Sequence, residues 1–149
     1  ASPILPNKFK LTKKVLYRSG KPMTFKNPGQ NLMLAKRMIE FMTAHGGIGL
    51  AGPQIGISRK VFVMQVDADE YHCFNPEIPA SSEELITHQE GCLSFPDEFL
   101  KIERPKTVVA RFWDHEGNEV IRQFEGLGSI CYQHELDHCN GIVFHDKAN

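Results

Sequence analysis

Two features that would point to a membrane protein or a nucleic-acid-binding protein are missing. The longest apolar runs, such as Val61 to Met64, fall far short of the 18 or more residues that a membrane-spanning helix needs. The formal net charge is −1 and there is no basic block, so the sequence lacks the clustered positive charge that binds the phosphates of nucleic acid. We therefore expect no membrane association, no nucleic-acid site and a small partner.

A secretory signal and a transit peptide are also not recognised at the N-terminus. The chain has four cysteines, and its 149 residues are enough to fold without disulfide staples. We therefore expect reduced thiols and a cytoplasmic protein, with an organelle as the alternative.

No internal repeat, low-complexity tract or change in composition divides the chain. Hydrophobic residues make up 41% and charged residues 23%, which is typical of a globular protein. We expect a single domain over residues 1–149, with an irregular arm over residues 1–28.

Apolar residues spaced three and four apart predict an amphipathic helix from Gln30 to Ala44. A second helix is predicted from Leu127 to Cys139, ended by Asn140 and Gly141. Lys60–Val66 is apolar on both faces and predicts a buried strand. These elements favour an α+β fold with mainly antiparallel strands around the second helix.

The remaining strands are predicted from shorter signals. A hairpin is expected from the runs before and after the turn at residues 114–118, and a short last strand from Ile142 to Phe144. Asn75-Pro76 interrupts the run from Cys73 to Ile78, so a strand there should lie at a sheet edge or end early.

The chemistry is concentrated in Gln133–Gly141, which contains the pattern H-E-x-x-H on the second predicted helix. Residues four apart share one face of a helix, so His134 and His138 can bind the same metal ion. Glu135 lies about 100° around the helix, where its carboxylate can act as a general base. Two surface histidines on an ordinary helix are the alternative interpretation.

A catalytic metal needs a third protein ligand and an open position. The residue chemistry leaves this ligand open among Cys92, two carboxylates and three histidines: Glu90, Asp137, His88, His115 and His145. Asp137 is expected to contact a ligating histidine rather than the metal, and so to fix the tautomer of that ring. An ordinary buried cysteine is the alternative interpretation of Cys92.

Gly46–Gly56 is rich in glycine, and its only polar side chain is that of Gln54. Glycine allows a close approach of backbone to a ligand, although a flexible turn is the alternative. Gly47, Gly49 and Gly52 match a dinucleotide-binding spacing, but they precede a proline and a strand, so a dinucleotide site is rejected.

Three stretches together resemble the motifs of the peptide deformylases, in the same order and at matching intervals: GIGLAGPQ (Gly47–Gln54), EGCLS (Glu90–Ser94) and QHELDH (Gln133–His138). The resemblance runs from about Leu32 to Asp146. It implies hydrolysis of the N-formyl group from the first methionine of a nascent polypeptide, by a monomer that can act at the ribosome. The chain ends eight residues after Gly141, as short phage-encoded forms do, and a phage-infected host is therefore an alternative to a bacterium.

The resemblance also implies a role for each site residue. Cys92, His134 and His138 would bind one divalent metal ion per chain, with Fe(II) in the cell and Zn, Ni or Co able to replace it. Glu135 would be the general base, and the Gln54 amide and the Leu93 backbone N–H would stabilise the oxyanion.

Substrate contacts are implied as well. Backbone groups of Ile48, Gly49 and Gly91 would pair with an extended peptide, as an added strand does. The methionine side chain would contact Ile48, Ile130, Cys131 and the stem of His134, although the two middle residues are also ordinary core helix positions.

Glu90 and Arg104 are expected to form an ion pair that holds the cysteine segment, with a surface pair of no consequence as the alternative.

In two places the chain departs from the family pattern. Gly52 replaces an alanine, and Phe99 replaces an arginine that contacts the peptide backbone in some bacterial members.

Two other functions remain open: a metal-dependent amidase or peptidase acting on another substrate, and a non-catalytic metal-containing binder of N-terminal peptides.

Overall fold

The computed structural model describes residues 8–148 and has the expected α+β fold, in which all the strand pairs are antiparallel. The elements follow one another in the order α1 (Pro28–Ala44), β1 (Gly49–Ala51), η1 (Gly52–Ile55), β2 (Val61–Val66), β3 (Asp69–Ser81), β4 (Leu85–Cys92), β5 (Phe95–Pro105), β6 (Thr107–Trp113), β7 (Glu119–Glu125), α2 (Leu127–Cys139) and η2 (Phe144–Lys147). Here α marks an α-helix, β a strand and η a 3₁₀-helix.

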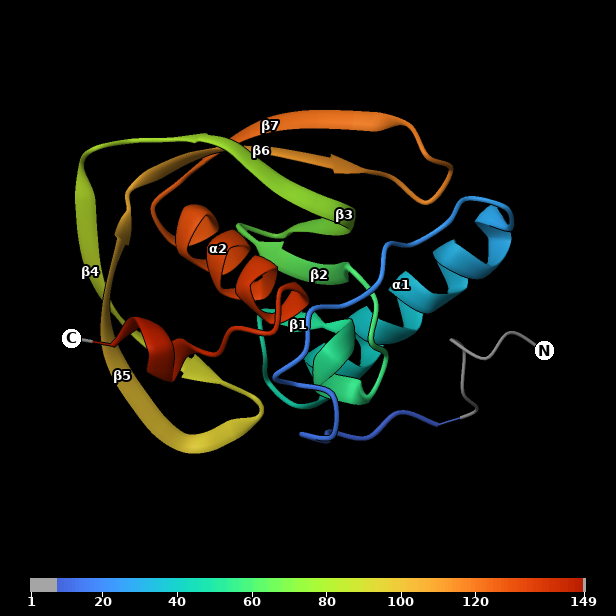
Figure 1. The fold of residues 1–149 in the computed structure, drawn as a ribbon, viewed down its shortest axis with the longest axis horizontal. Helices are drawn as coiled ribbons and strands as arrows, with labels where there is room; N and C mark the ends of the chain where they lie inside the picture. Colours follow the sequence, from blue (N-terminus) through green and yellow to red (C-terminus); the bar gives the residue numbers. More distant parts are fainter. Residues whose placement is uncertain (1–7, 149) are drawn as a thin grey trace.

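The strands form two sheets that flank one helix. Five strands pair in the order β1-β2-β3-β6-β7, and β4 pairs with β5 in a separate long hairpin. Helix α2 lies between the larger sheet and this hairpin (Figure 1). The second α-helix is therefore the central element of the fold, as expected.

Helix α1 follows the expected amphipathic pattern and begins two residues earlier than predicted. Asn27 caps it by accepting a hydrogen bond from the backbone N–H of Gln30 (3.1 Å), and Pro28 suits the first turn because it has no N–H to satisfy. Its apolar face, which includes Leu34, Met38 and Met42, is buried against the core.

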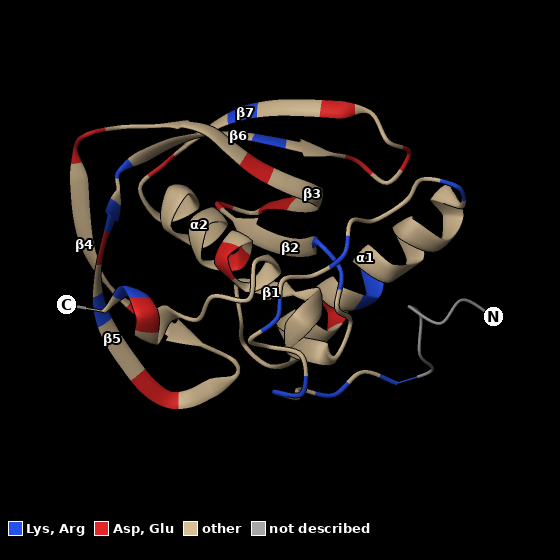
Figure 2. Ribbon diagram, viewed as in Figure 1, with Lys and Arg blue, Asp and Glu red and all other residues tan. Residues whose placement is uncertain are grey.

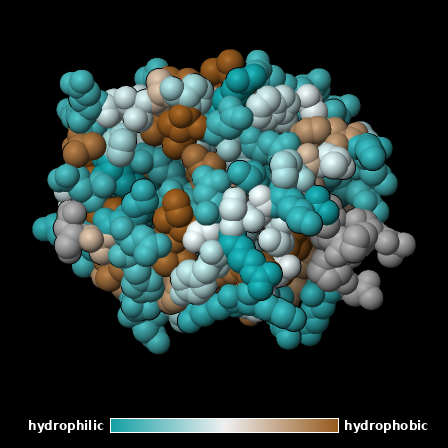
Figure 3. All heavy atoms as spheres, in the orientation of Figure 1, coloured by the Kyte–Doolittle hydropathy of each residue, from teal (hydrophilic) through white to brown (hydrophobic). Residues whose placement is uncertain are grey.

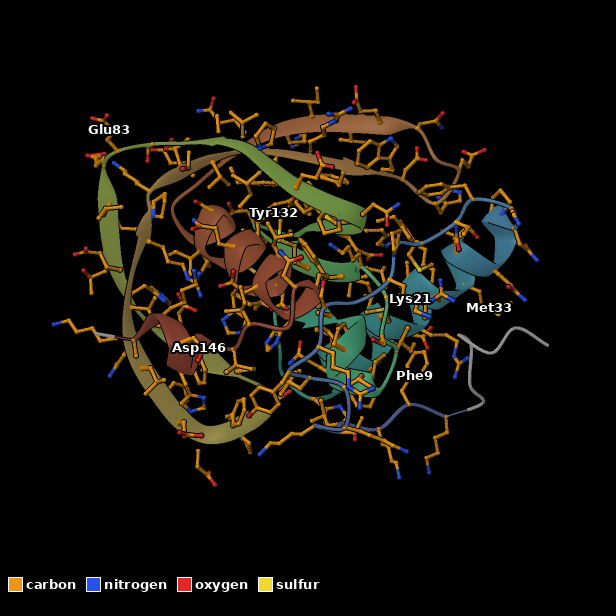
Figure 4. All side chains as sticks on the ribbon, in the orientation of Figure 1. Phe9, Lys21, Met33, Glu83, Tyr132 and Asp146 are labelled. Atoms are coloured by element: carbon orange, nitrogen blue, oxygen red, sulfur yellow. The ribbon has the colours of Figure 1, made fainter. Side chains whose placement is uncertain are left out.

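Helix α2 has the predicted bounds and packs on the larger sheet through Tyr132. The Tyr132 side chain is fully buried, and its hydroxyl donates to the backbone carbonyls of Glu77 and Arg111, at 2.9 and 3.2 Å (Figure 4). The two carbonyls belong to neighbouring strands, so this residue fixes α2 against the sheet.

The expectation for Cys73–Ile78 was wrong, because these residues belong to β3, a 13-residue strand inside the larger sheet. Pairing with β2 ends at Phe74, and the register with β6 shifts between Phe74 and Glu77. Pro76 lies in this irregular segment, where its missing N–H interrupts no ladder. Asn75 adopts a left-handed conformation there, with φ of 51°.

The predicted strand at Ile142–Phe144 was also wrong. Gly141 has a positive φ of 77° and ends the turn after α2, as expected, but η2 then begins at Phe144. Phe144 is buried against Phe95, and the two rings stack with their centroids 5.7 Å apart. Side-chain packing, rather than strand pairing, therefore holds this segment.

The described part of the N-terminal arm, residues 8–27, forms an irregular strap across α1, η1 and the end of α2; residues 1–7 of the expected arm lie outside the described residues. Its buried side chains are Phe9, Leu16 and Met23. Neither helix among residues 8–148 combines the length and the apolar character needed to cross a membrane.

Replacing Asn75 should destabilise the fold, because its side chain joins the bulge of β3 to the strap. The amide accepts from the Met23 N–H (2.8 Å) and donates to the Met23 carbonyl (3.1 Å). Asn75→Ala loses both bonds and strains the left-handed backbone, so we expect the free energy of unfolding to fall by about 2–3 kcal/mol in urea titrations.

Asn75→Gly is the matched control, because it loses the same bonds without the strain and should cost about 1 kcal/mol less. An alanine variant as stable as the parent would contradict this account of the bulge.

Candidate metal and catalytic site

The candidate site lies where three separate elements meet. Cys92 ends β4, His134 and His138 lie one turn apart on α2, and Gln54 is in η1. The structure brings together the residues to which the family resemblance gave roles in metal binding and catalysis, and of the candidates for the third ligand only Cys92 joins the two histidines in the described residues.

The cysteine and the two histidines form a tight cluster. The Sγ atom of Cys92 lies 3.3 Å from Nε2 of His138, which lies 3.2 Å from Nε2 of His134, and the three ligand atoms are within 4.8 Å of one another. Two nitrogens bound tetrahedrally at about 2.0–2.1 Å from a cation are separated by about 3.3 Å. The spacing therefore suits a shared metal ion.

Glu90 and Arg104 form an ion pair behind this cluster, as expected, and the pair is buried rather than on the surface. Arg104 donates to both carboxylate oxygens of Glu90 and, through Nη1, to Asp137 (3.0 Å). Burial opposes the charge on Glu90, but hydrogen bonds from His134 and Arg104 outweigh it and lower the pKa of this carboxyl. Glu90 therefore stays ionised.

The expectation that Asp137 fixes a histidine tautomer was wrong. Oε1 of Glu90 lies 2.8 Å from Nδ1 of His134, whereas Asp137 contacts Arg104. The helix places Asp137 beside the arginine, and the carboxylate that orients the ring comes from β4. This contact directs Nε2 of His134 toward the cluster.

The electrostatics of the cluster favour a positive charge at its centre. Burial lowers the pKa of the His134 ring, but contacts with Cys92 and Glu90 outweigh it and raise the pKa to about 10. Burial and the neighbouring His134 lower the pKa of His138 well below its usual value, so that ring stays neutral, the form that binds metals.

Glu135 is buried next to the cluster on the side of β1. Burial raises the pKa of its carboxyl to about 7, which suits a group that takes and returns a proton near neutral pH. A methyl group on Gly49 would lie 2.5 Å from Oε2 of Glu135 and 3.0 Å from Sγ of Cys131. Only glycine at this position lets β1 approach the carboxylate so closely.

Two buried side-chain nitrogen and oxygen atoms have no hydrogen-bond partner among residues 8–148: Oε1 of Glu135 and Nδ1 of His138. Buried polar atoms are rarely left unpaired unless a ligand, an ion or water completes the site. The unpaired oxygen of Glu135, together with one thiol and two imidazoles as donors, supports a divalent transition metal in the cluster.

Gln54 is buried and fixed at both ends of its amide. Its Oε1 accepts from the Ala51 N–H (2.9 Å), and its Nε2 donates to Oγ of Ser94 (3.1 Å) and lies 3.5 Å from Sγ of Cys92. The donor end therefore faces the cysteine, and Leu93 lies between Cys92 and Ser94. The role of Ser94 was missed, because a serine inside a motif carries no signal that it orients a glutamine.

A cavity of about 390 Å³ opens beside the cluster. It is lined by all the residues for which a substrate contact was predicted: Ile48, Gly49, Gly91, Ile130, Cys131 and His134. Cys131 also packs in the core behind the cavity, as the alternative interpretation held, and its contact with a substrate stays a prediction. The cavity also exposes apolar side chains to solvent at Ile48, Phe99 and Leu127.

Phe99 changes the cavity at the position of the expected arginine. It pairs with Gly91 across the β4–β5 hairpin, and its ring covers that glycine, since a methyl group on Gly91 would lie 2.9 Å from the ring. The backbone of Gly91 therefore has an apolar neighbour in place of a cation.

The comparisons with known proteins agree with this geometry. A family model described as polypeptide deformylase matches residues 8–149. The peptide deformylase of Thermotoga neapolitana is 41% identical over 133 residues, which are 89% of this chain and 80% of that protein. The crystal structure of peptide deformylase from Thermotoga maritima has a TM-score of 0.90 at 36% identity and covers 97% of this chain and 99% of its own.

A third similar protein is the Met-Ala-Ser-bound class I type b peptide deformylase from Acinetobacter baumannii. Its TM-score is 0.89 at 30% identity, over 93% of this chain and 97% of that one.

Removing Arg104 should destabilise the fold because it leaves Glu90 charged and buried without its cation. We expect Arg104→Met to lower the free energy of unfolding by about 3–5 kcal/mol in denaturant titrations. Arg111→Met is the matched control, because Arg111 pairs with Glu119 on the surface and its loss should cost less than about 1 kcal/mol. Equal losses for the two variants would mean that the buried pair has no special role.

Proposed function

The chain belongs to the polypeptide deformylase family, whose members hydrolyse the formyl group from N-formylmethionyl polypeptides, and we propose that its residues divide this reaction as follows. The proposal rests on one observation: three metal-ligand atoms within 4.8 Å of one another lie beside a buried, unpartnered carboxylate at the wall of a cavity.

Cys92, His134 and His138 would hold one divalent cation, with Glu90 orienting His134 and Arg104 holding Glu90 in place. When bound, such a cation supplies Lewis acidity, which lowers the pKa of water toward neutrality and polarises a carbonyl group. Fewer than four protein ligands leave room for water and substrate.

Glu135 would move the proton. The carboxylate takes a proton from the water that attacks the formyl carbon and gives it to the α-amine as the carbon–nitrogen bond breaks. The products are formate and a free methionine amine. A pKa near neutrality allows the same group to act as base and then as acid.

Gln54 and Leu93 would stabilise the negative charge that develops on the formyl oxygen. The Nε2 group of Gln54 already lies on the cysteine side of the site, and its amide cannot turn freely because Ala51 and Ser94 hold both ends. A fixed donor needs no reorganisation during the reaction, and the loss of one such donor typically costs about 10²–10³ in kcat.

The peptide would lie along the cavity between β1 and β4. Backbone groups of Ile48, Gly49 and Gly91 would pair with it, a mode of recognition that tolerates varied sequence. The first side chain would contact Ile48, Ile130, Cys131 and the stem of His134. Burial raises the pKa of the Cys131 thiol well above its usual value, so this thiol stays uncharged.

The remaining assignments rest on the family alone. We propose a single catalytic domain that acts as a monomer in the cytoplasm of a bacterium or of a phage-infected host, on nascent chains at the ribosome. The proposed metal in the cell is Fe(II). Zinc, nickel and cobalt also suit imidazole and thiolate ligands.

Glu135→Gln tests the division of roles. The variant keeps the metal ligands but cannot take a proton, so formate release from formyl-Met-Ala-Ser should fall by about 10²–10⁴ while the metal content stays near one per chain. Cys92→Ala is the comparison, because it should lose metal as well as activity.

Two outcomes would contradict the proposal. A parent protein that binds the formyl peptide without releasing formate would be a peptide binder, and one that cuts an internal peptide bond would be a peptidase.

The identity of the metal is tested by exposure to air. Thiolate-bound Fe(II) is prone to oxidation, so the Fe(II) form should lose formate-releasing activity in air while the Ni(II) form keeps it. Equal rates of decay for the two forms would argue against inactivation at an iron centre.

A further inference from the structure

The net charge of −1 hides a strong separation of charge along the chain. Residues 1–60 contain 11 of the 17 lysines and arginines but only one of the 18 acidic residues, Glu40. Charge asymmetry of this size between two parts of a chain indicates a polyanionic partner. The sequence-based expectation of no nucleic-acid site relied on the net charge and on the lack of a contiguous basic block, whereas the basic residues here are spread along 60 residues.

The strap, residues 8–27, is the most basic part of this half. It carries seven basic residues and no acidic one, and all seven side chains are exposed: Lys8, Lys10, Lys13, Lys14, Arg18, Lys21 and Lys26. Figure 2 shows the blue segments along the strap, whereas the red segments lie mainly on the strands. The lower edge of the face in Figure 3, where the strap runs, is hydrophilic.

The strap is held in place rather than loosely attached. Phe9, Leu16 and Met23, spaced seven residues apart, are buried. Backbone hydrogen bonds tie it to the domain, from Thr12 N–H to the Gln54 carbonyl and from Gly20 N–H to the Cys139 carbonyl, both 2.9 Å. Since the apolar side chains point inward, the cationic ones are presented outward at fixed positions.

These cations are not neutralised by acidic side chains among the described residues. Within residues 8–148, none of the seven forms an ion pair with an acidic side chain, whereas Arg104, Lys106 and Arg111 elsewhere all do. Lys13 lies over the ring of Phe95, 4.4 Å from its centroid, and remains exposed. The strap therefore offers unneutralised positive charge to a partner.

The exposed aromatic ring of the strap favours RNA over a membrane. Tyr17 is 60% exposed and lies between Lys14 and Arg18. Cations interleaved with an exposed ring are typical of surfaces that bind single-stranded nucleic acid, because bases stack on the ring. A membrane-binding segment would instead expose an apolar helical face, but the strap is irregular and its aliphatic and phenylalanine side chains are buried or partly buried.

We propose that the strap is an RNA-binding surface, in which Lys10, Lys13 and Lys14 contact phosphates and Tyr17 stacks on an unpaired base. Thr12 bonds to the backbone of Gln54 and Lys13 covers Phe95, so a bound RNA would lie beside the loops that carry the catalytic residues. The proposal does not depend on the hydrolytic mechanism.

The test is fluorescence anisotropy with a labelled 20-nucleotide single-stranded RNA, at KCl concentrations from 50 to 200 mM. The parent protein should bind, with affinity falling steeply as salt rises. Replacing Lys10, Lys13 and Lys14 by Gln should weaken binding at least about tenfold at 100 mM KCl and reduce the slope of log K against log salt by about 2. Tyr17→Ala should weaken binding about tenfold and leave the slope unchanged.

The matched control replaces Lys101, Arg122 and Lys147 by Gln, because these side chains are exposed in the acidic half and their loss changes the net charge equally. This variant should bind within about threefold of the parent. All variants should release formate from formyl-Met-Ala-Ser at the parent's rate, which shows that they are folded.

Three results would overturn the proposal. The parent could fail to bind RNA at 50 mM KCl, the two triple variants could lose affinity equally, or vesicles with 30% anionic lipid could bind as tightly as RNA and with the same dependence on the strap.

Discussion

The site depends on the buried contact of Glu90 with Arg104 and His134. Cys92 comes from the β4–β5 hairpin and both histidines come from α2, so the cluster forms only if the hairpin and the helix are held in register. Glu90 on β4 orients His134, and Arg104 on β5 binds both Glu90 and Asp137. A buried ion pair contributes little net stability, but removing one partner is costly. Such a pair therefore favours one placement of the β4–β5 hairpin against α2 over the alternatives.

The same alignment accounts for the electrostatics of the site. Ionised Glu90 favours positive charge on or near His134, while burial keeps His138 neutral and raises the pKa of Glu135. The proposed cation site and the proposed proton-transferring carboxyl thus depend on the same few contacts. Gly49 completes the arrangement because only a residue without a side chain fits against Glu135.

Much of the fold and of the candidate site could be predicted from the sequence, because the patterns that indicate them lie within single helices or strands. The four-residue spacing of His134 and His138 fixes their common helical face, and α2 has the predicted bounds. The choice of Cys92 as the third ligand needed the family resemblance, since composition left several candidates open. The part played by Asp137 was wrong because a helical position alone does not reveal that Arg104 from another strand reaches it. Similarly, Pro76 lies inside a central strand because a bulge removes the cost of its missing N–H, and a bulge depends on the neighbouring strand.

The central claim is that Cys92, His134 and His138 together bind one metal ion. X-ray absorption spectroscopy of the zinc-loaded protein tests it most directly, because sulfur and nitrogen ligands are distinguished by distance. The account predicts one sulfur at about 2.3 Å and nitrogen or oxygen ligands at about 2.0–2.1 Å, with the sulfur signal lost in Cys92→Ser. A spectrum without a sulfur ligand, or one that is unchanged in the serine variant, would contradict it.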